Sequence, residues 1–555
     1  MSQIKTQRIS KRQLGQFMTP PALAERLVGE LTFMPTDTVL EPSFGNGSFI
    51  LPLIEAFLPF YTGSIQERLA SVLTHNIYGV EYDLKLYQEC LSAIENKWGH
   101  LPERHNLVHG DFFRHWFYGM PSLPLNRVRE TIGGLFDEYQ RFDVVIGNPP
   151  FGGTIDPSLQ DHLDKQFGLR GGEKIKKETY SFFIVKCMDL LKPEGRLRFI
   201  CSDTFLTINT MRGLRLFVMG QGKPSITSLH GFSEETKYPM VVLDINKVAS
   251  TVLCVNGEDI AFSLLHKTGN VSWQVTADLA SYFDGPKIGD YLVATSGMTT
   301  GANELFVRSI HNGKIVEPYQ FEFFEEKVTL QREKERARLG VISPRKQQSI
   351  VSQEREGRTR RNVRISPCAK PVEINLPHPD YHFYNKAAKG LVYAPPSHVI
   401  YWKDDGDAVL TFKKNGNWYL YGVGGMPFFG RSGFTWPLIA TSLNARYLPP
   451  GYILDSGAPC AFLRPGMHED ELYFILGWTF SPLCQKLLKE VINHTKNIQG
   501  KDVERLPYPF WVNEVHKTDI TRRVRNLVTD ALQGRTVTKA DADFRAVAES
   551  FASKM

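Results

Sequence analysis

Apolar and polar residues follow two different rhythms along the first half of the chain. Short continuous apolar runs are typical of buried strands, and segments with apolar residues three and four positions apart are typical of amphipathic helices. The predicted strands are Thr38–Leu40, Ile77–Glu81, Asn106–His109, Phe142–Gly147 and Gly195–Cys201, and the predicted helices between them are Phe49–Leu58, Asp83–Trp98 and Tyr180–Leu191. Alternating strands and helices predict an α/β fold with a doubly wound, mainly parallel sheet. A ligand of such a sheet binds at the carboxyl ends of its strands.

The pattern changes in the second half of the chain. Met240–Asn246 and Thr251–Val255 read as consecutive strands, which predicts an antiparallel edge on the sheet. From about Ser281 the helical spacing fades, and Gly, Pro and aromatic residues become dense. We therefore expect one domain over residues 1–265, an irregular β-rich domain over 285–510, and a charged helical tail over 511–555.

Composition places the chain among ordinary globular proteins. It is 42% hydrophobic and 22% charged, and its seven cysteines include no C-x-x-C pair. This argues against a zinc site or a disulfide framework and suits a reducing cytoplasm, so we expect no metal. The basic N-terminus lacks an apolar signal region, and no apolar run is long enough to cross a bilayer.

Positive charge is concentrated in one segment. The formal net charge is +6, and Gln331–Arg364 carries eleven Lys and Arg against four Glu. Such a block can follow a phosphate backbone, with Arg355, Arg358, Arg360 and Arg361 as candidate contacts. The alternative is a solvated loop or an exposed helix.

Three successive strand ends carry residues suited to a nucleotide-like cofactor. Gly45 and Gly47 follow the first strand, where glycine allows close backbone approach and positive φ. Glu81 ends the second strand and could accept hydrogen bonds from ribose hydroxyls, while Asp111 and Phe112 follow the third and could contact a purine. Taken one at a time, these features have ordinary structural alternatives. The glycines could form a tight turn, Glu81 could be a carboxylate at a helix N-terminus, and Asp111 with Phe112 could be a helix cap followed by core aromatics. Their order favours the cofactor interpretation.

The fourth strand ends in Asn148, Pro149, Pro150 and Phe151. The exocyclic amine of adenine is a poor nucleophile because its lone pair is delocalised into the ring. Two acceptors that hold the amine hydrogens out of the ring plane would localise it. The Asn148 side-chain oxygen and the Pro149 carbonyl, held by the rigid Pro-Pro, can do this, and Phe151 can stack on a base flipped from the duplex. Asn and Pro also form plain turns, but this position after a cofactor pattern favours chemistry.

These motifs together resemble the gamma-class adenine DNA methyltransferases, a group that includes Eco57I-like restriction–modification methylases. The matching stretches, in the order of that family, are GQFMTP (15–20), EPSFGNGSF (41–49), YGVEYD (78–83), HGDFF (109–113) and GNPPFGG (147–153), with weaker matches at 180–200 and 202–206. The resemblance covers roughly the first 260 residues. One departure is Phe44, which stands where the family usually has a small residue before the glycine.

The resemblance implies a fold, a cofactor and site residues. The fold is a seven-stranded Rossmann-like class I methyltransferase sheet followed by a target-recognition domain. The cofactor is S-adenosyl-L-methionine. Thr19 and Pro20 would approach its methionine part, Glu41, Pro42, Gly45 and Gly47 would line it, Glu81 would meet its ribose, and Asp111 and Phe112 its adenine. A second aromatic under the target base is expected at Tyr238, with Phe232 as a rival.

The second domain carries weaker similarities to the same family. Residues 295–308, 492–509 and 436–462 resemble segments of its target-recognition regions and of phage-defence methyltransferases. Gly- and aromatic-rich loops with dispersed cations suit contacts to double-stranded DNA. The candidates are Arg431, Arg446, Lys496 and Lys501, each of which also fits a phosphate contact or plain surface charge. Trp402, Trp418 and Trp436 fit core packing.

Other functions share parts of this pattern. Methyltransferases that act on an RNA base or a protein glutamine amide also carry Asn-Pro-Pro-aromatic, but we expect them to lack the upstream Thr-Pro segment and the large second domain. A non-catalytic specificity subunit fits poorly with an intact catalytic motif. A fused nuclease usually precedes the Thr-Pro segment, where the sequence leaves no room. A separately encoded restriction nuclease or phage-defence proteins are candidate partners, and an asymmetric site suits a monomer.

The basic segment gives the first testable prediction. Reversing the charge of several arginines between Arg355 and Arg364 should weaken DNA binding and flatten its dependence on salt, because each phosphate contact releases counterions. The measurement is the slope of log binding constant against log salt concentration. An unchanged slope would favour the solvated-loop alternative.

Overall fold

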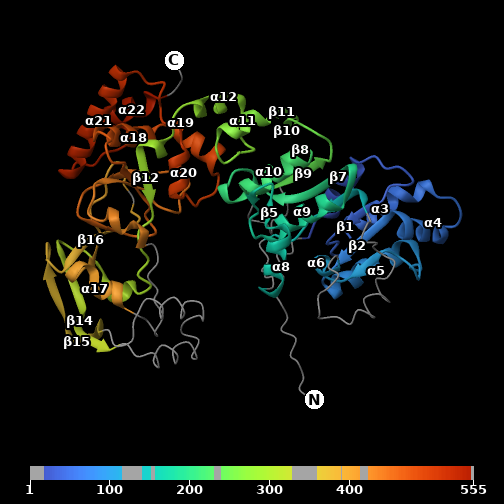
Figure 1. Ribbon diagram of the computed structural model, residues 1–555, viewed down its shortest axis with the longest axis horizontal. Coiled ribbons are helices and arrows are strands. Elements are labelled where there is room, and N and C mark those ends of the chain that lie inside the picture. The colour runs from blue at the N-terminus through green and yellow to red at the C-terminus, as the bar shows by residue number, and fades with distance from the viewer. Residues whose placement is uncertain are drawn as a thin grey trace. The chain divides into compact units, whose positions relative to one another are not determined.

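Strands of the first half of the chain form one sheet in the order β11-β10-β8-β9-β7-β4-β1-β2-β3 (Figure 1). The computed structural model describes residues 18–115, 141–151, 157–229, 239–327, 359–388, 390–412 and 423–551. It divides into two compact units, Met1–Ala280 and Ser281–Met555. The strands of the first sheet are β1 (Val39–Glu41), β2 (Ile77–Glu81), β3 (Leu107–His109), β4 (Phe142–Gly147), β7 (Leu191–Ser202), β8 (Lys223–Leu229), β9 (Met240–Asn246), β10 (Val252–Val255) and β11 (Glu258–Ala261).

The parallel part of this sheet confirms the predicted strands. β1 pairs in parallel with β2 on one side and with β4 on the other, and β3 and β7 extend the parallel set. The strands are buried almost throughout, as expected for a sheet covered on both faces. The chain order reverses between β1 and β4, and this switch point is where α/β sheets bind ligands.

The other edge of the sheet differs from the prediction. β9 is antiparallel to β7 as expected, but it also pairs with β8, a strand that the hydrophobic pattern did not single out. β10 therefore pairs with β8 rather than with β9, and β11 extends the edge. The expected seven-stranded sheet accordingly has nine strands in the described part of the chain. β8 was missed because its sequence, KPSITSL, is mostly polar and has a proline at its second position.

The helices that flank this sheet include the three that the periodicity indicated, α3 (Ile50–Phe57), α5 (Leu84–Trp98) and α9 (Thr179–Leu190). Others, which the periodicity did not single out, are α2 (Pro21–Gly29), α4 (Ile65–Ser71), α8 (Pro157–Phe167) and α10 (Arg212–Gln221). α3 and α5 contact β2, α9 contacts β7, and α10 contacts β8. α9 is buried along nearly its whole length.

A buried ion pair connects α2 to the sheet. Arg198 on β7 lies opposite Asp244 on β9, and their side chains approach to 2.6 Å. The Arg198 guanidinium, 5% exposed, also donates to the Leu27 carbonyl at 2.7 Å and pairs with Glu30 at 3.0 Å. Arg198 therefore holds the C-terminal end of α2 against the sheet.

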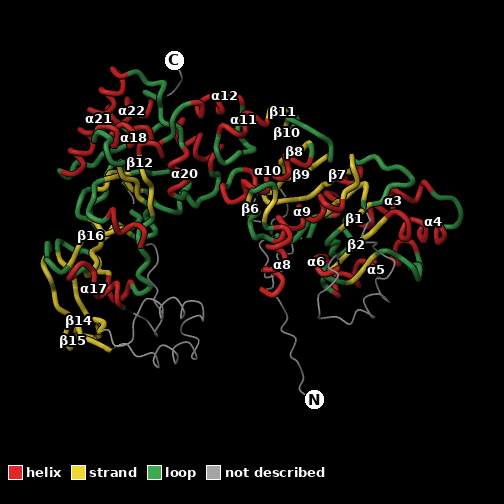
Figure 2. The backbone as a smooth tube through the Cα atoms, in the orientation of Figure 1, coloured by secondary structure: helices red, strands yellow, loops and turns green. Residues whose placement is uncertain are grey.

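The second unit contains two small sheets and a long ribbon. The sheets are β12 (Leu292–Thr295), β21 (Cys460–Leu463), β18 (Gly433–Thr435) and β19 (Arg446–Leu448), and β13 (Val307–Ser309), β17 (His398–Tyr401), β16 (Tyr381–Asn385) and β20 (Tyr452–Leu454), each in that order. The ribbon, β14 (Lys314–Lys327) with β15 (Thr359–Asn375), is antiparallel (Figure 2). This part of the chain is β-rich and irregular, as the sequence indicated.

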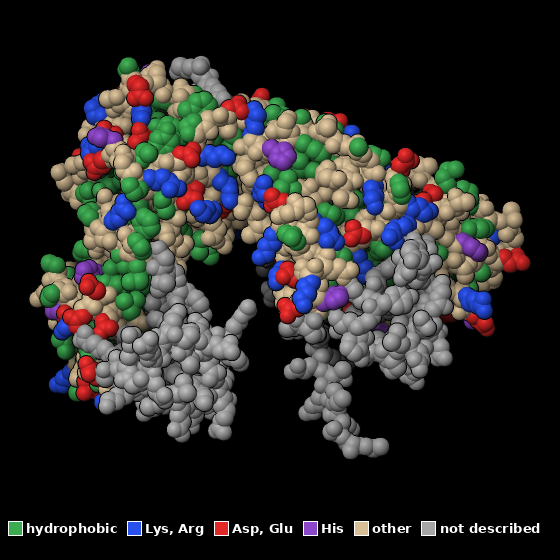
Figure 3. All heavy atoms as spheres, viewed as in Figure 1, with side chains coloured by type: hydrophobic (Ala, Val, Ile, Leu, Met, Phe, Trp, Pro, Cys, Tyr) green, Lys and Arg blue, Asp and Glu red, His purple; other side chains and the backbone are tan. Residues whose placement is uncertain are grey.

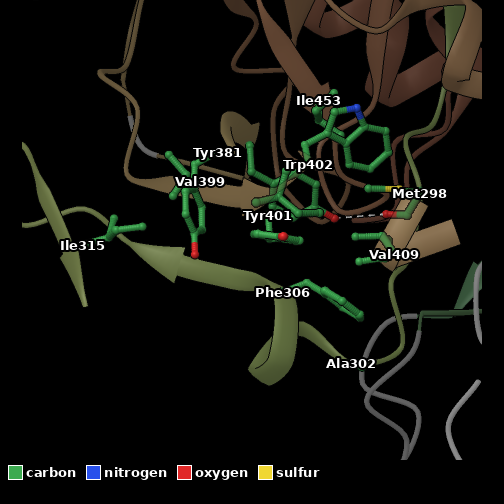
Figure 4. Packing of buried hydrophobic residues seen from close by; sticks show 13 residues of the cluster. Met298, Ala302, Phe306, Ile315, Tyr381, Val399, Tyr401, Trp402, Val409 and Ile453 are labelled. Atoms are coloured by element: carbon green, nitrogen blue, oxygen red, sulfur yellow. Dashed lines mark hydrogen bonds between the residues drawn. The ribbon is translucent and has the colours of Figure 1, made fainter. Parts of the chain in front are cut away.

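Aromatic residues form the core beneath the ribbon. Phe306, Tyr401 and Trp402 lie together with Met298 and Val409 in one buried cluster (Figure 4). Phe321 of β14 stacks on Tyr401 with ring centroids 3.9 Å apart, so the ribbon is tied to the body of the unit. Trp402 and Trp436 are buried, in agreement with core packing, while Trp418 lies outside the described residues.

Helices complete the second unit. α17 (Lys403–Thr411), α18 (Asp470–Phe480), α19 (Pro482–Lys486) and α20 (Gly500–Arg505) precede α21 (Glu514–Leu532) and α22 (Ala542–Glu549). α21 and α22, from the segment expected as a tail, pack against α18. A Cβ at Gly477 of α18 would lie 2.8 Å from Val524 and 3.2 Å from Val547, so glycine permits this close approach.

The Arg198 pair can be tested by stability. Arg198→Met should lower the free energy of unfolding by about 3 kcal/mol, because Asp244 would lose a buried partner and keep only Arg196. Arg26→Met is the control: its exposed pair with Glu30, at 4.0 Å, should contribute less than about 1 kcal/mol. Urea unfolding measures both variants, and equal losses would contradict the assignment.

Candidate active site

The turn after β1 brings its backbone close to two neighbouring elements. Gly45 and Gly47 both have positive φ, at +58° and +90°. A Cβ on Gly47 would lie 2.6 Å from the Cys90 sulfur of α5, so a larger residue would not fit. The Gly45 amide donates to Glu81 Oε2 at 2.7 Å, which connects the turn to the end of β2. The turn therefore needs glycine at these positions, because of their positive φ and, at Gly47, because of the close packing against α5.

Phe44 in this turn packs against β2. A Cβ at Gly79 would lie 2.7 Å from the Phe44 ring, and the ring centroids of Phe44 and Tyr87 are 6.0 Å apart. The bulky residue that departs from the family pattern is thus accommodated by a glycine on the neighbouring strand. Its side chain is buried in the core.

Two glutamates end the adjacent strands β1 and β2. Glu81 accepts hydrogen bonds from the Gly45 and Asp83 amides, both at 2.7 Å. Glu41 is 1% exposed, and among the described residues its Oε2 has no hydrogen-bond partner. Burial, and then the charge of Glu81, raise the pKa of Glu41 well above its ordinary value. Burial also raises the pKa of Glu81, against the effect of its two amide donors. A buried carboxyl oxygen at a strand end is an acceptor available to a ligand.

The end of β3 is held by a residue that the sequence analysis did not select. Lys186 of α9, 3% exposed, donates to the Phe112 carbonyl at 2.5 Å, and its nitrogen lies 4.3 Å from the centroid of the Phe112 ring. Burial lowers the pKa of Lys186 well below its ordinary value, and nearby Asp111 acts in the opposite direction. The feature of the sequence that could have indicated Lys186 is its position as a single cation within the apolar run SFFIVKCM.

Asp111 and Phe112 are themselves built into the local fold. Asp111 Oδ1 accepts from the Phe113 amide at 2.9 Å, as in a helix cap. Phe112 is buried and stacks on Phe183, with centroids 5.1 Å apart and planes 19° apart. The helix cap and the core aromatic, which were the alternative interpretation of Asp111 and Phe112, are therefore present. Contact of this pair with a purine stays a prediction.

Asn148 follows directly on β4, beside the turn after β1. Its Nδ2 donates to the Thr19 hydroxyl at 3.2 Å, across a large separation in sequence. The Thr19 carbonyl in turn accepts from the Ser48 hydroxyl at 3.0 Å. A Cβ at Gly147 would lie 2.7 Å from Glu41 Oε1, so glycine lets the Glu41 carboxyl lie against β4. The structure therefore brings the Thr-Pro segment, the glycine turn and the Asn-Pro-Pro motif together.

The proposed stacking residues are less accessible. Phe151 is 7% exposed, and Pro149 is buried while Pro150 is half-buried. Tyr238 and its rival Phe232 lie outside the described residues. Stacking on a target base stays a prediction for Phe151 and Tyr238 alike.

The four cations of the second unit that were predicted to contact DNA differ in exposure. Arg431, Lys496 and Lys501 are exposed, and Lys501 pairs with Glu504 at 2.5 Å. Arg446 is 3% exposed, and its guanidinium donates to the Lys386 and Ala388 carbonyls, both at 2.9 Å. This geometry makes Arg446 a support for a loop and argues against the expected contact with DNA.

The other four cations that the sequence predicted to contact DNA are not among the described side chains. Arg355 and Arg358 lie outside the described residues, as do the side chains of Arg360 and Arg361. On the face shown in Figure 3, described Lys and Arg side chains are interspersed with Asp and Glu. No single basic patch is evident on that face among the residues described.

No group of three or more His, Cys, Asp and Glu is arranged to hold a metal ion within the described ranges. Within the same ranges, no helix combines the length and the apolar content needed to cross a membrane.

Comparison with known proteins identifies the class. Residues 64–236 match the family described as Eco57I restriction-modification methylase. Type II methyltransferase M.BstVI of Geobacillus stearothermophilus is 27% identical over 250 residues, which are 42% of each protein. M.HincII of Haemophilus influenzae is 26% identical over 216 residues, 38% of this chain and 32% of that protein. The matches span less than half the length of these relatives.

Solved structures share the fold over nearly the whole chain. A nuclease-deletion mutant of the Type ISP restriction-modification enzyme LlaGI, in complex with a DNA substrate mimic, is 12% identical, with TM-score 0.56, over 92% of this chain and 46% of that one. The Type IIL restriction-modification enzyme MmeI, in complex with DNA, is 11% identical, with TM-score 0.52, over 98% of this chain and 75% of that one. At these identities the likeness concerns the fold.

The first unit therefore has a class I methyltransferase fold, built on the mainly parallel sheet described above. Within the class, the resemblance to Eco57I-like restriction–modification methylases is confirmed.

Burial of Glu41 predicts a pH dependence of stability. Since the folded pKa is raised, the stability contributed by protonated Glu41 is fully present below about pH 4.5 and is lost as pH rises through the folded pKa. Each unit of that rise costs about 1.4 kcal/mol at high pH. Glu41→Gln, which stays neutral, should therefore be more stable than the natural protein at pH 8 and similar at pH 4.5.

The measurement is the thermal unfolding midpoint across this pH range. Glu25→Gln, at an exposed position on α2, is the matched control and should follow the natural profile. A Glu41→Gln profile parallel to that of the natural protein would show that the Glu41 carboxyl does not titrate as its burial implies.

Proposed function

We propose that the protein is a site-specific DNA methyltransferase that uses S-adenosyl-L-methionine to methylate the exocyclic amine of an adenine flipped out of duplex DNA. The observation that carries the proposal is the position of Asn148. It lies at the carboxyl end of β4, at the switch point of the sheet, beside the glycine turn and with its amide held by Thr19. The choice of adenine rests on the sequence resemblance.

The residues present fit the cofactor. Glu41 offers a buried acceptor oxygen, and Glu81 is fixed by two amides at the end of β2, as a ribose-binding carboxylate would need to be. Gly45 and Gly47 leave two positions of the turn without side chains, and Thr19 and Pro20 with Pro42 would line the same region. Asp111 and Phe112 would border the adenine moiety. The bound cofactor supplies a methyl group on a sulfonium, which is a strong electrophile.

The chain itself has to make the amine nucleophilic. The Asn148 side-chain oxygen and the Pro149 carbonyl would each accept one amine hydrogen, and so would draw the nitrogen lone pair out of the ring. Both acceptors are preorganised, because Pro149 and Pro150 restrict the backbone. Catalysis then consists mainly of alignment and fixed dipoles. Because Phe151 is buried, stacking requires that its ring become accessible when DNA binds.

The second unit is proposed as the target-recognition domain. Its fold is shared with restriction–modification enzymes solved on DNA, which favours DNA over an RNA base or a protein glutamine amide as the substrate. Arg431, Lys496 and Lys501 remain candidate contacts. All seven cysteines are free, which supports a reducing cytoplasm as the compartment. Action with a separate restriction nuclease or phage-defence proteins, and a monomeric state, are part of the same proposal.

The function is tested by mapping modified bases. Purified protein is incubated with S-adenosyl-L-methionine and unmethylated genomic DNA, which is then read by single-molecule sequencing. We expect N6-methyladenine within one short motif. N4-methylcytosine would keep the amine chemistry and overturn the choice of adenine. No modification by a protein that binds the cofactor would favour an RNA or protein substrate, or a requirement for a partner.

Asn148→Ala is the matched control in that experiment. We expect it to lose at least about 100-fold in methyl transfer, because one of two amine acceptors is gone, and to bind the cofactor as the natural protein does. Isothermal titration measures the binding. Near-normal turnover of the variant would contradict the mechanism.

A further inference from the structure

Two segments of the site share a local sequence design. Thr19 is followed by Pro20 and Pro21, and Asn148 by Pro149 and Pro150. A residue before proline is restricted to extended backbone conformations, so both segments are stiff at the position that carries the polar side chain. Pro20 is itself extended, and α2 begins at the next residue. The two polar side chains that these prolines hold are hydrogen-bonded to each other.

Thr19 has two contacts that serve different partners. Its carbonyl accepts from Ser48 at 3.0 Å, which anchors the backbone of the segment to the glycine turn. Its hydroxyl accepts from Asn148 Nδ2 at 3.2 Å. Thr19 is 6% exposed, and Arg198 holds the far end of α2 on the sheet. The segment is therefore fixed without the hydroxyl, whose partner among the described residues is Asn148.

The two ends of the Asn148 amide are opposite in polarity. With Nδ2 directed at Thr19, the oxygen Oδ1 is turned to the other side of the amide group. If the amide were rotated by half a turn, it would present hydrogens to the hydrogens of a target amine, and the acceptor would be lost. A hydroxyl can accept from the nitrogen end or donate to the oxygen end, so this contact fixes the position of the amide group, and in the structure it is the nitrogen end that is bound.

We propose that Thr19 is a positioning residue for methyl transfer, whose hydroxyl orients the Asn148 amide so that its oxygen faces the target amine. This inference rests on the proposed function. It assigns the Thr19 side chain to Asn148, in addition to the expected proximity of the Thr-Pro segment to the cofactor. The glycine turn, through Ser48 and Thr19, is thereby connected to the catalytic motif.

The test compares two variants of Thr19. Thr19→Val keeps the shape and removes the hydroxyl, and Thr19→Ser keeps the hydroxyl. We expect Thr19→Val to slow single-turnover methyl transfer about tenfold, as the loss of one hydrogen bond in the transition state would. Thr19→Ser should stay within about twofold of the natural protein. The dissociation constant for DNA, measured by titration, should be unchanged in both variants, and the dissociation constant for the cofactor should rise by less than the rate falls.

A second background separates orientation from packing. Asn148→Ala removes the side chain that the Thr19 hydroxyl contacts, so no contact between the two side chains remains to be lost. In that background we expect Thr19→Val to have less than about a threefold effect on the residual rate. A full tenfold effect there would show that the hydroxyl acts through the surrounding structure rather than through the amide.

The remaining outcomes overturn the inference in distinct ways. A Thr19→Val rate equal to the natural rate shows that the position of Asn148 does not depend on the Thr19 hydroxyl. A cofactor dissociation constant that rises in step with the loss of rate assigns the hydroxyl to the cofactor. A natural protein that transfers no methyl group to DNA overturns the proposed function and this inference with it, whereas an active natural protein with unaffected Thr19 variants overturns this inference alone.

Discussion

The parallel pairing of β1 with β2 on one side and β4 on the other is the constraint on which the site depends. In this register Glu41 lies opposite Gly79, and Leu40 lies opposite Val145. The carboxyl ends of the three strands therefore meet at one edge, where the chain order reverses. Glu41, Glu81 and Asn148 are far apart in sequence and become neighbours only through this pairing.

Three glycines, which have no side chain, allow close packing at this edge of the sheet. Gly147 leaves room for the Glu41 carboxyl, Gly79 for the Phe44 ring, and Gly47 for the Cys90 sulfur. Ionisable side chains at this edge are buried and are held there against the cost of burial. Burial raises the pKa of Glu41 and lowers the pKa of Lys186, so both side chains are biased toward neutral forms. In such surroundings a single hydrogen bond, such as that from Asn148 to Thr19, counts for more than it would in water.

Much of the first unit could be predicted from sequence because its signals are local. Buried parallel strands are short apolar runs, and the helices between them keep their spacing, so the parallel core was predicted correctly. β8 was missed because its sequence is mostly polar and has a proline at its second position, although the strand lies between β10 and β9 in the sheet. The failure changed the strand count and the partner of β10, and it left the site at the switch point unaffected. In the second unit, Arg446 looked like a surface cation, and its buried contacts with two carbonyls depend on strands distant in sequence.

The sequence by itself determined the candidate chemistry, because residue types and their order are local properties: a glycine turn, acidic strand ends, and Asn-Pro-Pro-Phe. It also determined the stiffness of the two segments that precede prolines. Only the tertiary structure decided which of these residues meet. The contact of Thr19 with Asn148, the support of Phe112 by Lys186, and the burial of Glu41 all result from strand order and helix packing, which no local pattern encodes.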